Sequence, residues 1–177
     1  MTDPTLDRRT LLASGACAAL MACSNAKETA PMTEASPAAS GTDTDIDWAS
    51  LTEAQWRERL TPEAFRVLRK EGTERAGTSP LNQEKRAGTF VCAGCALPLF
   101  SSEAKYESGT GWPSFFDALD GAVETKRDFK LIVPRTEYHC ARCGGHQGHV
   151  FEDGPQPTGL RYCNNGVALD FVPADAA

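Results

Sequence analysis

The stretch Phe90-Val91-Cys92-Ala93-Gly94-Cys95 joins a short apolar run to two cysteines separated by two residues. A second pair with the same spacing, Cys140-Ala141-Arg142-Cys143, follows another short run at residues 137–139. One C-x-x-C pair can present two thiolates to a metal ion, and two pairs complete the tetrahedral four-sulfur shell that zinc favours. We therefore predict one structural zinc ion bound by Cys92, Cys95, Cys140 and Cys143, with no open position for water.

Two alternatives use these cysteines differently. Each pair could be a redox dithiol or a disulfide, but a thioredoxin-like C-x-x-C opens a helix in a βαβ unit, and that pattern does not surround either pair. The second pair could also bind zinc together with the histidines of His146-Gln147-Gly148-His149. That site would leave the first pair without a role, and its span is tight for one tetrahedral centre.

Short apolar or alternating runs, separated by Gly, Pro, Asn or Asp, fill the chain from Phe90 onward. Strands this brief and this closely spaced favour antiparallel sheets, so the predicted fold class is mainly β. The predicted strands are residues 90–91, 97–100, 122–125, 129–133, 137–139, 149–151, 160–163 and 167–172.

Two short helices are predicted ahead of these strands, where folded sequence begins near residue 48. Ser50 and Glu53 suit a capping box for a helix through about residue 60. Thr61-Pro62-Glu63 then offers an N-cap, a proline at the first helical position and an acidic first turn, and Glu71-Gly72 ends the second helix. We expect both helices to be packing elements with no chemical role.

Residues 1–25 read as an export signal of the twin-arginine type, because a charged start ends in Arg8-Arg9 and an apolar run follows. The run closes at Leu20-Met21-Ala22-Cys23, which resembles a lipoprotein processing site that would leave Cys23 lipid-modified. Residues 26–47 hold no aromatic residue and read as a disordered linker to one domain, 48–177. These patterns predict an exported protein on the periplasmic side, with membrane contact only through a lipid on Cys23. The alternative is a cytoplasmic protein with an apolar, disordered start.

The bulk composition limits the kind of partner. The chain is 41% hydrophobic and 24% charged, as in an ordinary globular protein, and its formal net charge is −6. Nucleic-acid binding selects for Lys and Arg on one face, so an acidic chain argues against a nucleic-acid partner.

Cys163 is the one cysteine that neither the C-x-x-C pairs nor the export signal uses, and it lies in Arg161-Tyr162-Cys163-Asn164-Asn165-Gly166-Val167. On a strand, this spacing puts the side chains of Arg161, Cys163 and Asn165 on one face. A nearby cation favours the thiolate, which is the nucleophilic form of cysteine. The alternative is a buried structural cysteine, since free cysteines are among the most buried residues.

Two further features could act together with this cysteine, and the first lies in the same predicted strand region. His146 and His149 flank conformationally permissive backbone, which suits proton transfer, although either histidine alone would more often be a satisfied core or surface residue. The loop Glu107-Ser108-Gly109-Thr110-Gly111-Trp112-Pro113-Ser114-Phe115-Phe116 holds an indole ahead of a proline. Its aromatic residues would more often be core than pocket, so a binding role for Trp112 follows only in combination with the other groups.

Taken in order, these motifs resemble the methionine-R-sulfoxide reductase B family, over about residues 51–171. The resemblance implies two antiparallel β-sheets in a barrel-like (β-tent) arrangement with a structural zinc ion. It also implies an oxidoreductase that reduces the R epimer of methionine sulfoxide in proteins and peptides. The motifs are Cys92-x-x-Cys95, Ser108-Gly109-Thr110-Gly111-Trp112-Pro113-Ser114-Phe115, Cys140-x-x-Cys143, Gly145-His146-x-Gly148-His149-Val150-Phe151, Asp153-Gly154-Pro155 and Arg161-Tyr162-Cys163-x-Asn165.

The resemblance also implies roles for individual residues. Cys163 would be the catalytic cysteine, whose thiolate attacks the sulfoxide sulfur and is left as a sulfenic acid. Either histidine could supply the proton that the departing oxygen needs, and Trp112 would receive the methyl group of the substrate. The other implied roles are thiolate stabilisation by Arg161, binding of a water or the sulfoxide oxygen by Asn165, and substrate binding by Phe115 and Thr110.

One departure from the family bears on turnover. Many members carry a resolving cysteine where this chain has Thr110, and no other cysteine is left to pair with Cys163. The partners implied are therefore oxidised proteins or peptides and an external thioredoxin-like or other thiol reductant. The main alternative is a non-enzymatic, zinc-stabilised β-fold binding module, which would need no reactive Cys163. A dithiol redox protein would instead lack zinc and depend on Cys92 or Cys140.

Overall fold

The computed structural model describes residues 46–131 and 133–176. The predicted export signal, with Cys23, and all but the last two residues of the predicted linker lie outside the described residues. No helix among the described residues combines the length and the apolar character that crossing a bilayer requires.

Two helices precede the strands, as predicted. Helix α1 (Glu53–Arg59) is capped by Thr52, whose side chain accepts from the Gln55 backbone while the Gln55 side chain accepts from the Thr52 backbone. The capping box is therefore two residues later than the predicted Ser50, because Thr52 and Gln55 form the reciprocal pair. Helix α2 (Pro62–Lys70) has the predicted Thr61 N-cap and ends at Glu71, which adopts a left-handed conformation with φ of 52°.

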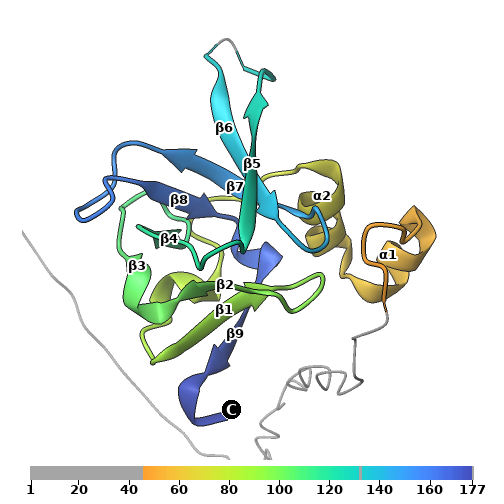
Figure 1. Cartoon of the computed structure of the whole chain (residues 1–177), viewed down its shortest axis with the longest axis horizontal. Coiled ribbons are helices and arrows are strands. Elements are labelled where there is room, and N and C mark those ends of the chain that lie inside the picture. The colour runs from red at the N-terminus through yellow and green to blue at the C-terminus, as the bar shows by residue number, and fades with distance from the viewer. Residues whose placement is uncertain (1–45, 132, 177) are drawn as a thin grey trace, which may run out of the picture. The chain divides into compact units, whose positions relative to one another are not determined.

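The strands form two antiparallel sheets, which confirms the predicted fold class (Figure 1). The smaller sheet has the order β2-β1-β9 and the larger has the order β3-β4-β8-β7-β6-β5. The strands are β1 (Gly88–Cys92), β2 (Pro98–Ser101), β3 (Lys105–Tyr106), β4 (Ser114–Phe115), β5 (Val123–Asp128), β6 (Arg135–Cys140), β7 (His146–Phe151), β8 (Arg161–Asn164) and β9 (Leu169–Pro173). One short 3-10 helix, η2 (Pro80–Gln83), precedes the strands, and the others lie between or after them: η3 (Ser102–Ala104), η4 (Gly166–Ala168) and η5 (Ala174–Ala176).

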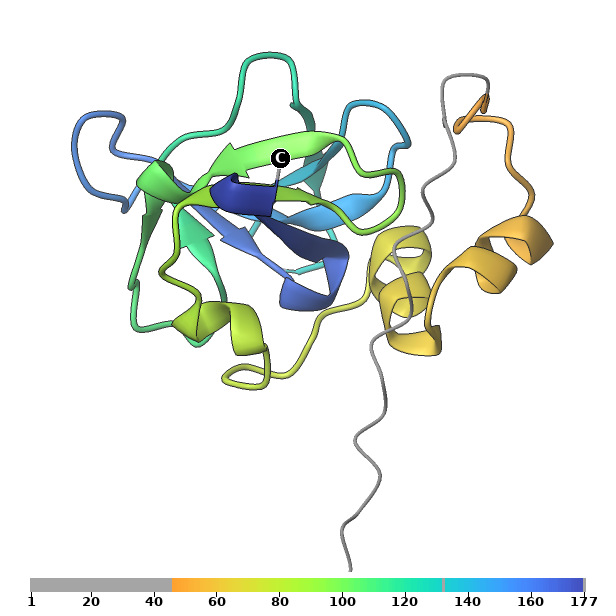
Figure 2. The same ribbon diagram turned by 90° about the horizontal axis from the view of Figure 1, so that it is seen from below.

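The expected barrel-like arrangement stays a prediction, because neither sheet closes on itself among the described residues. The smaller sheet has β2 and β9 as its edge strands, and the larger sheet has β3 and β5. Both helices lie to one side of the strands in the two views (Figures 1 and 2). Helix α2 contacts β7 of the larger sheet and also η4.

An aromatic cluster joins the two sheets and forms the centre of the core. Phe115 of β4 stacks on Phe100 of β2, with ring centroids 4.2 Å apart, and meets Phe90 of β1 edge-on at 4.9 Å. Tyr138 of β6 packs edge-on against Tyr162 of β8 at 5.2 Å. Phe115 is 0% exposed. The side chain expected to bind substrate is thus in the core between the sheets, where a substrate cannot reach it.

The predicted strand at residues 129–133 is wrong, because this apolar run connects β5 to β6. The two strands pair as far as Asp128 and Arg135, and the chain between them turns beyond the sheet (Figure 1). Phe129, Leu131 and Val133 are 71%, 56% and 73% exposed. A strand needs a partner or a covering layer as well as β-branched and aromatic residues, and none of the described elements covers this turn.

Candidate active site

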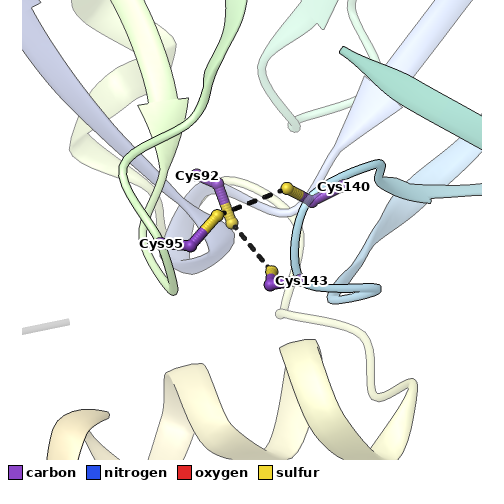
Figure 3. A group of neighbouring side chains, drawn as sticks. All are labelled: Cys92, Cys95, Cys140 and Cys143. Carbon is purple, nitrogen blue, oxygen red and sulfur yellow. Dashed lines mark hydrogen bonds between the residues drawn. The ribbon is translucent and has the colours of Figure 1, made fainter. Parts of the chain in front are cut away.

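The two C-x-x-C pairs meet between the sheets (Figure 3). The four sulfur atoms lie within 4.8 Å of one another, with Cys92 Sγ 3.7 Å from Cys143 Sγ and Cys95 Sγ 3.5 Å from Cys140 Sγ. Sulfurs bound to one tetrahedral zinc at about 2.3 Å would lie about 3.8 Å apart, whereas disulfide sulfurs would lie about 2.05 Å apart. The four cysteines could therefore bind a metal ion, and their spacing fits zinc.

A tight turn, or knuckle, at each C-x-x-C pair orients its two thiols. The Ala96 N–H donates to the Cys92 carbonyl at 2.8 Å, and the Gly144 N–H donates to the Cys140 carbonyl at the same distance. Ala96 and Gly144 take positive φ values of 57° and 66°, which glycine accepts freely and alanine rarely adopts. Because the first knuckle follows β1 and the second follows β6, a metal here would link the smaller sheet to the larger one.

The rival metal site of Cys140, Cys143, His146 and His149 does not form in the described part of the chain. The group of metal-binding side chains found together there consists of the four cysteines alone. His149 Nε2 instead lies 2.7 Å from Asp128 Oδ2.

Cys163 lies on β8 in a pocket of about 110 Å³. A larger cavity of about 460 Å³ lies beside η4 and β9, but it contains neither Cys163 nor a histidine, so the smaller pocket is the candidate active site. The residues that line this pocket are Thr73, Trp112, Arg135, Gly148, His149, Phe151, Cys163, Asn164 and Asn165.

Strand pairing brings His149 and Cys163 together. The two residues are direct partners in the antiparallel β7–β8 ladder, and such partners project from the same face. Gly148 makes the close approach possible, because a Cβ on it would lie 1.9 Å from the Cys163 carbonyl oxygen. The local sequence Gly148-His149 thus places an imidazole directly across from the thiol.

His149 forms a pair with a carboxylate that sequence reasoning missed. Asp128 Oδ2 lies 2.7 Å from His149 Nε2 and also 2.7 Å from a guanidinium nitrogen of Arg135. Burial lowers the pKa of His149 despite the opposing effect of Asp128, while the Lys130 N–H, His149 and Arg135 hold the pKa of Asp128 well below its usual range. This part of the site therefore combines a neutral imidazole with an ionised carboxylate.

His146 has a different environment from His149. It is 2% exposed, does not line the pocket, and its ring centroid lies 5.5 Å from that of His149. Its Nδ1 is 2.9 Å from Glu137 Oε1, but the geometry is not that of a hydrogen bond. Of the two histidines, His149 is thus the one that faces the pocket.

Arg161 acts on Cys163 less strongly than its spacing suggested. Its guanidinium makes two hydrogen bonds to Asp153, at 2.7 and 2.8 Å, and lies 4.3 Å from the centre of the Phe151 ring. Burial raises the pKa of the Cys163 thiol, and the Thr110 hydroxyl and Arg161 offset only part of this rise. Without substrate, the thiol form of Cys163 is therefore favoured over the expected thiolate.

The Trp112 loop supplies one wall of the pocket and a contact to the nucleophile. Thr110 Oγ1 lies 3.9 Å from Cys163 Sγ, within hydrogen-bonding range for sulfur. The Trp112 indole N–H donates to the Glu74 carbonyl at 3.0 Å, which fixes the orientation of the ring. Gly111, between these two residues, takes a φ of 87°.

Asn165 makes two structural hydrogen bonds. Its Nδ2 donates to the Gln147 carbonyl at 2.9 Å, and its Oδ1 accepts from the Glu74 N–H at 2.8 Å. The side chain is 4% exposed. Both ends of the Asn165 amide, which was expected to hold a water or the sulfoxide oxygen, thus already bond to backbone groups.

These features describe a mainly β protein with a four-cysteine cluster that could bind a metal ion and a fifth cysteine in a separate pocket. The family model described as the SelR domain matches residues 60–173. The chain belongs to the peptide methionine sulfoxide reductase MsrB family, and it is an oxidoreductase that reduces methionine sulfoxide.

Curated relatives match most of the chain. The MsrB peptide methionine sulfoxide reductase of Leptospira interrogans is 52% identical over 121 residues, which cover 68% of this chain and 92% of the relative. The MsrB protein of Thiobacillus denitrificans is 54% identical over 125 residues, or 70% of this chain and 95% of the relative. Among solved structures, the Mis18 "Yippee-like" domain is 20% identical with a TM-score of 0.39, over 49% of this chain and 96% of that one.

Proposed function

We propose that the enzyme reduces the R epimer of methionine sulfoxide in proteins and peptides, with Cys163 as the nucleophile. The observation that carries this proposal is the pairing of His149 with Cys163 across β7 and β8, in the pocket that Trp112 also lines. A sulfoxide that enters this pocket meets a sulfur nucleophile, a proton carrier and an aromatic wall.

The proposed first step conserves the proton of the Cys163 thiol. Cys163 Sγ attacks the sulfoxide sulfur while His149 takes the thiol proton, and Asp128 stabilises the imidazolium that forms. His149 returns the proton to the sulfoxide oxygen. As this oxygen moves to Cys163 Sγ, both its bond to the substrate sulfur and the sulfur–sulfur bond formed in the attack break. Methionine leaves, and Cys163 becomes a sulfenic acid. A thiol with a raised pKa opposite a neutral imidazole suits this route.

Epimer choice follows from the two unlike walls of the pocket. The R epimer would place its methyl group against Trp112 and its oxygen toward His149. Exchanging the methyl group and the oxygen would direct an electron-rich acceptor at the negative face of the indole. The S epimer would therefore be disfavoured by repulsion as well as by the loss of a proton donor.

An external thiol would complete the turnover. Cys163 is the only cysteine outside the four-cysteine cluster in the described part of the chain. Thr110, where many family members carry a resolving cysteine, lies with its Oγ1 3.9 Å from Cys163 Sγ. One thiol condenses with the sulfenic acid to give a mixed disulfide and water, and a second thiol releases Cys163 and leaves as a disulfide. Mass spectrometry of the oxidised enzyme tests this step, because a Cys163 disulfide within one chain would contradict it.

The four-cysteine cluster supports a structural zinc ion. Cys92, Cys95, Cys140 and Cys143 would hold it, and four thiolates leave no position for a reacting water. Gln147 Nε2 lies 3.3 Å from Cys92 Sγ and provides a donor to that sulfur. Zinc would thus stabilise the junction of the sheets and take no part in sulfoxide reduction.

Export is the proposed location, on the strength of the Arg8-Arg9 start, the apolar run and Cys23. Sequencing the amino terminus of the mature protein and measuring its mass would test processing and lipidation together. An intact, unmodified amino terminus in the producing cell would contradict the proposal.

The central experiment compares both epimers of a methionine sulfoxide peptide, with the wild type and with Cys163→Ser. We expect wild-type reduction of the R epimer in the presence of dithiothreitol and no reduction by the variant. Equal activity of the variant, or a preference for the S epimer, would refute the proposed function.

A further inference from the structure

Glu74 joins two walls of the active-site pocket, although it lies far from both in the sequence. It belongs to the segment between α2 and η2 and is 8% exposed. Its backbone N–H donates to Asn165 Oδ1 at 2.8 Å, and its backbone carbonyl accepts from the Trp112 indole at 3.0 Å. One residue thereby contacts the aromatic wall and the end of the nucleophile strand.

The carboxylate of Glu74 adds a third contact on the nucleophile side. Its Oε2 accepts from the Gly166 N–H at 2.6 Å, directly after Asn165 and three residues after Cys163. A Cβ on Gly166 would lie 1.9 Å from Ser79 Oγ and 3.2 Å from Glu74 Oε2, so the backbone at Gly166 packs tightly against these two side chains. The Gly166 N–H is buried, and removing its acceptor would leave it unsatisfied.

The partners of this carboxylate show that it works as a hydrogen-bond acceptor. No ion pair of the described residues includes Glu74. Its Oε1 lies 3.4 Å from the Thr78 hydroxyl, whose proton can also bond to the Arg75 carbonyl at 2.7 Å. A glutamine could therefore keep its oxygen on Gly166 and donate its amide to Thr78.

From these contacts we propose that Glu74 is a positioning residue that sets the distance between Trp112 and the Cys163 strand. This distance decides whether a methyl group fits against the indole while the sulfoxide sulfur reaches Cys163 Sγ. The inference rests on the proposed function, and it makes Glu74 a determinant of epimer discrimination without direct contact with substrate.

Three substitutions test the role of the carboxylate. Glu74→Ala removes it, Glu74→Asp withdraws it by one methylene, and Glu74→Gln keeps an acceptor in place. We expect the first two variants to raise KM for an R-sulfoxide peptide roughly tenfold, with a smaller change in kcat and a reduced R-over-S ratio. The KM and the R-over-S ratio of Glu74→Gln should stay within about threefold of the wild-type values, because the glutamine oxygen still accepts from the Gly166 N–H and keeps the wall in place.

Glu71→Gln is the matched control, because Glu71 lies on the same segment but contacts Lys126 and Lys130 on β5 and in the β5–β6 turn. It should leave KM and the epimer ratio unchanged. If Glu74→Ala does not fold, Glu74→Asp and Glu74→Gln decide the question. A wild-type KM and epimer ratio in Glu74→Asp, or equal kinetic losses in Glu74→Asp and Glu74→Gln, would overturn the inference. A wild type without R preference would instead overturn the proposed function.

Discussion

Replacing Asp128 with asparagine tests the proton relay most directly. Asp128 Oδ2 lies 2.7 Å from His149 Nε2, and the carboxylate side chain is 4% exposed. The substitution keeps the shape of the side chain but removes the charge that would stabilise an imidazolium. The groups that act on His149 in the fold are then the Arg135 guanidinium and the His146 ring, both of which lower its pKa.

The size of the effect follows from the loss of one buried hydrogen bond between charged groups. Such a bond contributes about 1.5–3 kcal/mol, which corresponds to a roughly ten- to 150-fold loss in kcat/KM if the transition state alone contains the imidazolium. The acid limb of the pH profile should also move. Asp128 raises the pKa of His149 against the lowering effect of burial, so its removal shifts the pKa, and the acid limb, to lower pH.

The assay is kcat/KM for an R-sulfoxide peptide with dithiothreitol between about pH 5 and 9, the range in which histidine titrates. Glu124→Gln is the control, because Glu124 Oε2 lies 3.4 Å from His139 Nε2 and neither residue lines the pocket. We expect the control to retain wild-type rate and pH profile. An Asp128→Asn enzyme with an unmoved acid limb and less than twofold loss would refute the relay through His149.

Three other substitutions probe the metal site, the core and the apolar turn. Cys140→Ser should abolish stoichiometric zinc, measured by atomic absorption, and lower the melting temperature, because three sulfurs no longer complete the shell; full zinc content would contradict the assigned ligands. Phe115→Ala should cost about 3–5 kcal/mol in urea unfolding, since it empties the space between Phe90 and Phe100. Phe129→Ser should change the free energy of unfolding by less than about 0.5 kcal/mol, because the ring is 71% exposed, and a larger loss would mean that the turn is packed.

Local sequence accounts for the features that depend on neighbouring residues. The Thr61 N-cap and Pro62 start of α2 could be predicted because capping involves atoms within one turn. The four cysteines could be grouped because C-x-x-C spacing already limits the geometry of each knuckle. Cys163 could be singled out once the other cysteines had roles.

The rest of the site depends on contacts between distant segments. Asp128 has no sequence signal near His149, and it reaches the imidazole only because β5, β6 and β7 are adjacent strands. Glu74 is likewise separated from Trp112 and Asn165 by long stretches of chain. Alternation along a strand predicts which side chains share a face, but it does not say which face a second sheet will cover.

The sequence by itself determined the mainly β fold class, the grouping of the four C-x-x-C cysteines and the choice of Cys163 as the proposed nucleophile, because short-range spacing constrains each of them. Tertiary structure decided that His149 faces the pocket, that Phe115 is core and that the apolar run after Asp128 is exposed. It also decided the protonation of Cys163, because burial outweighs the Arg161 charge and raises the pKa of the thiol. The physical reason is that burial and charge pairing depend on where the two sheets and the helices meet, and a residue's own neighbours in the chain do not specify that.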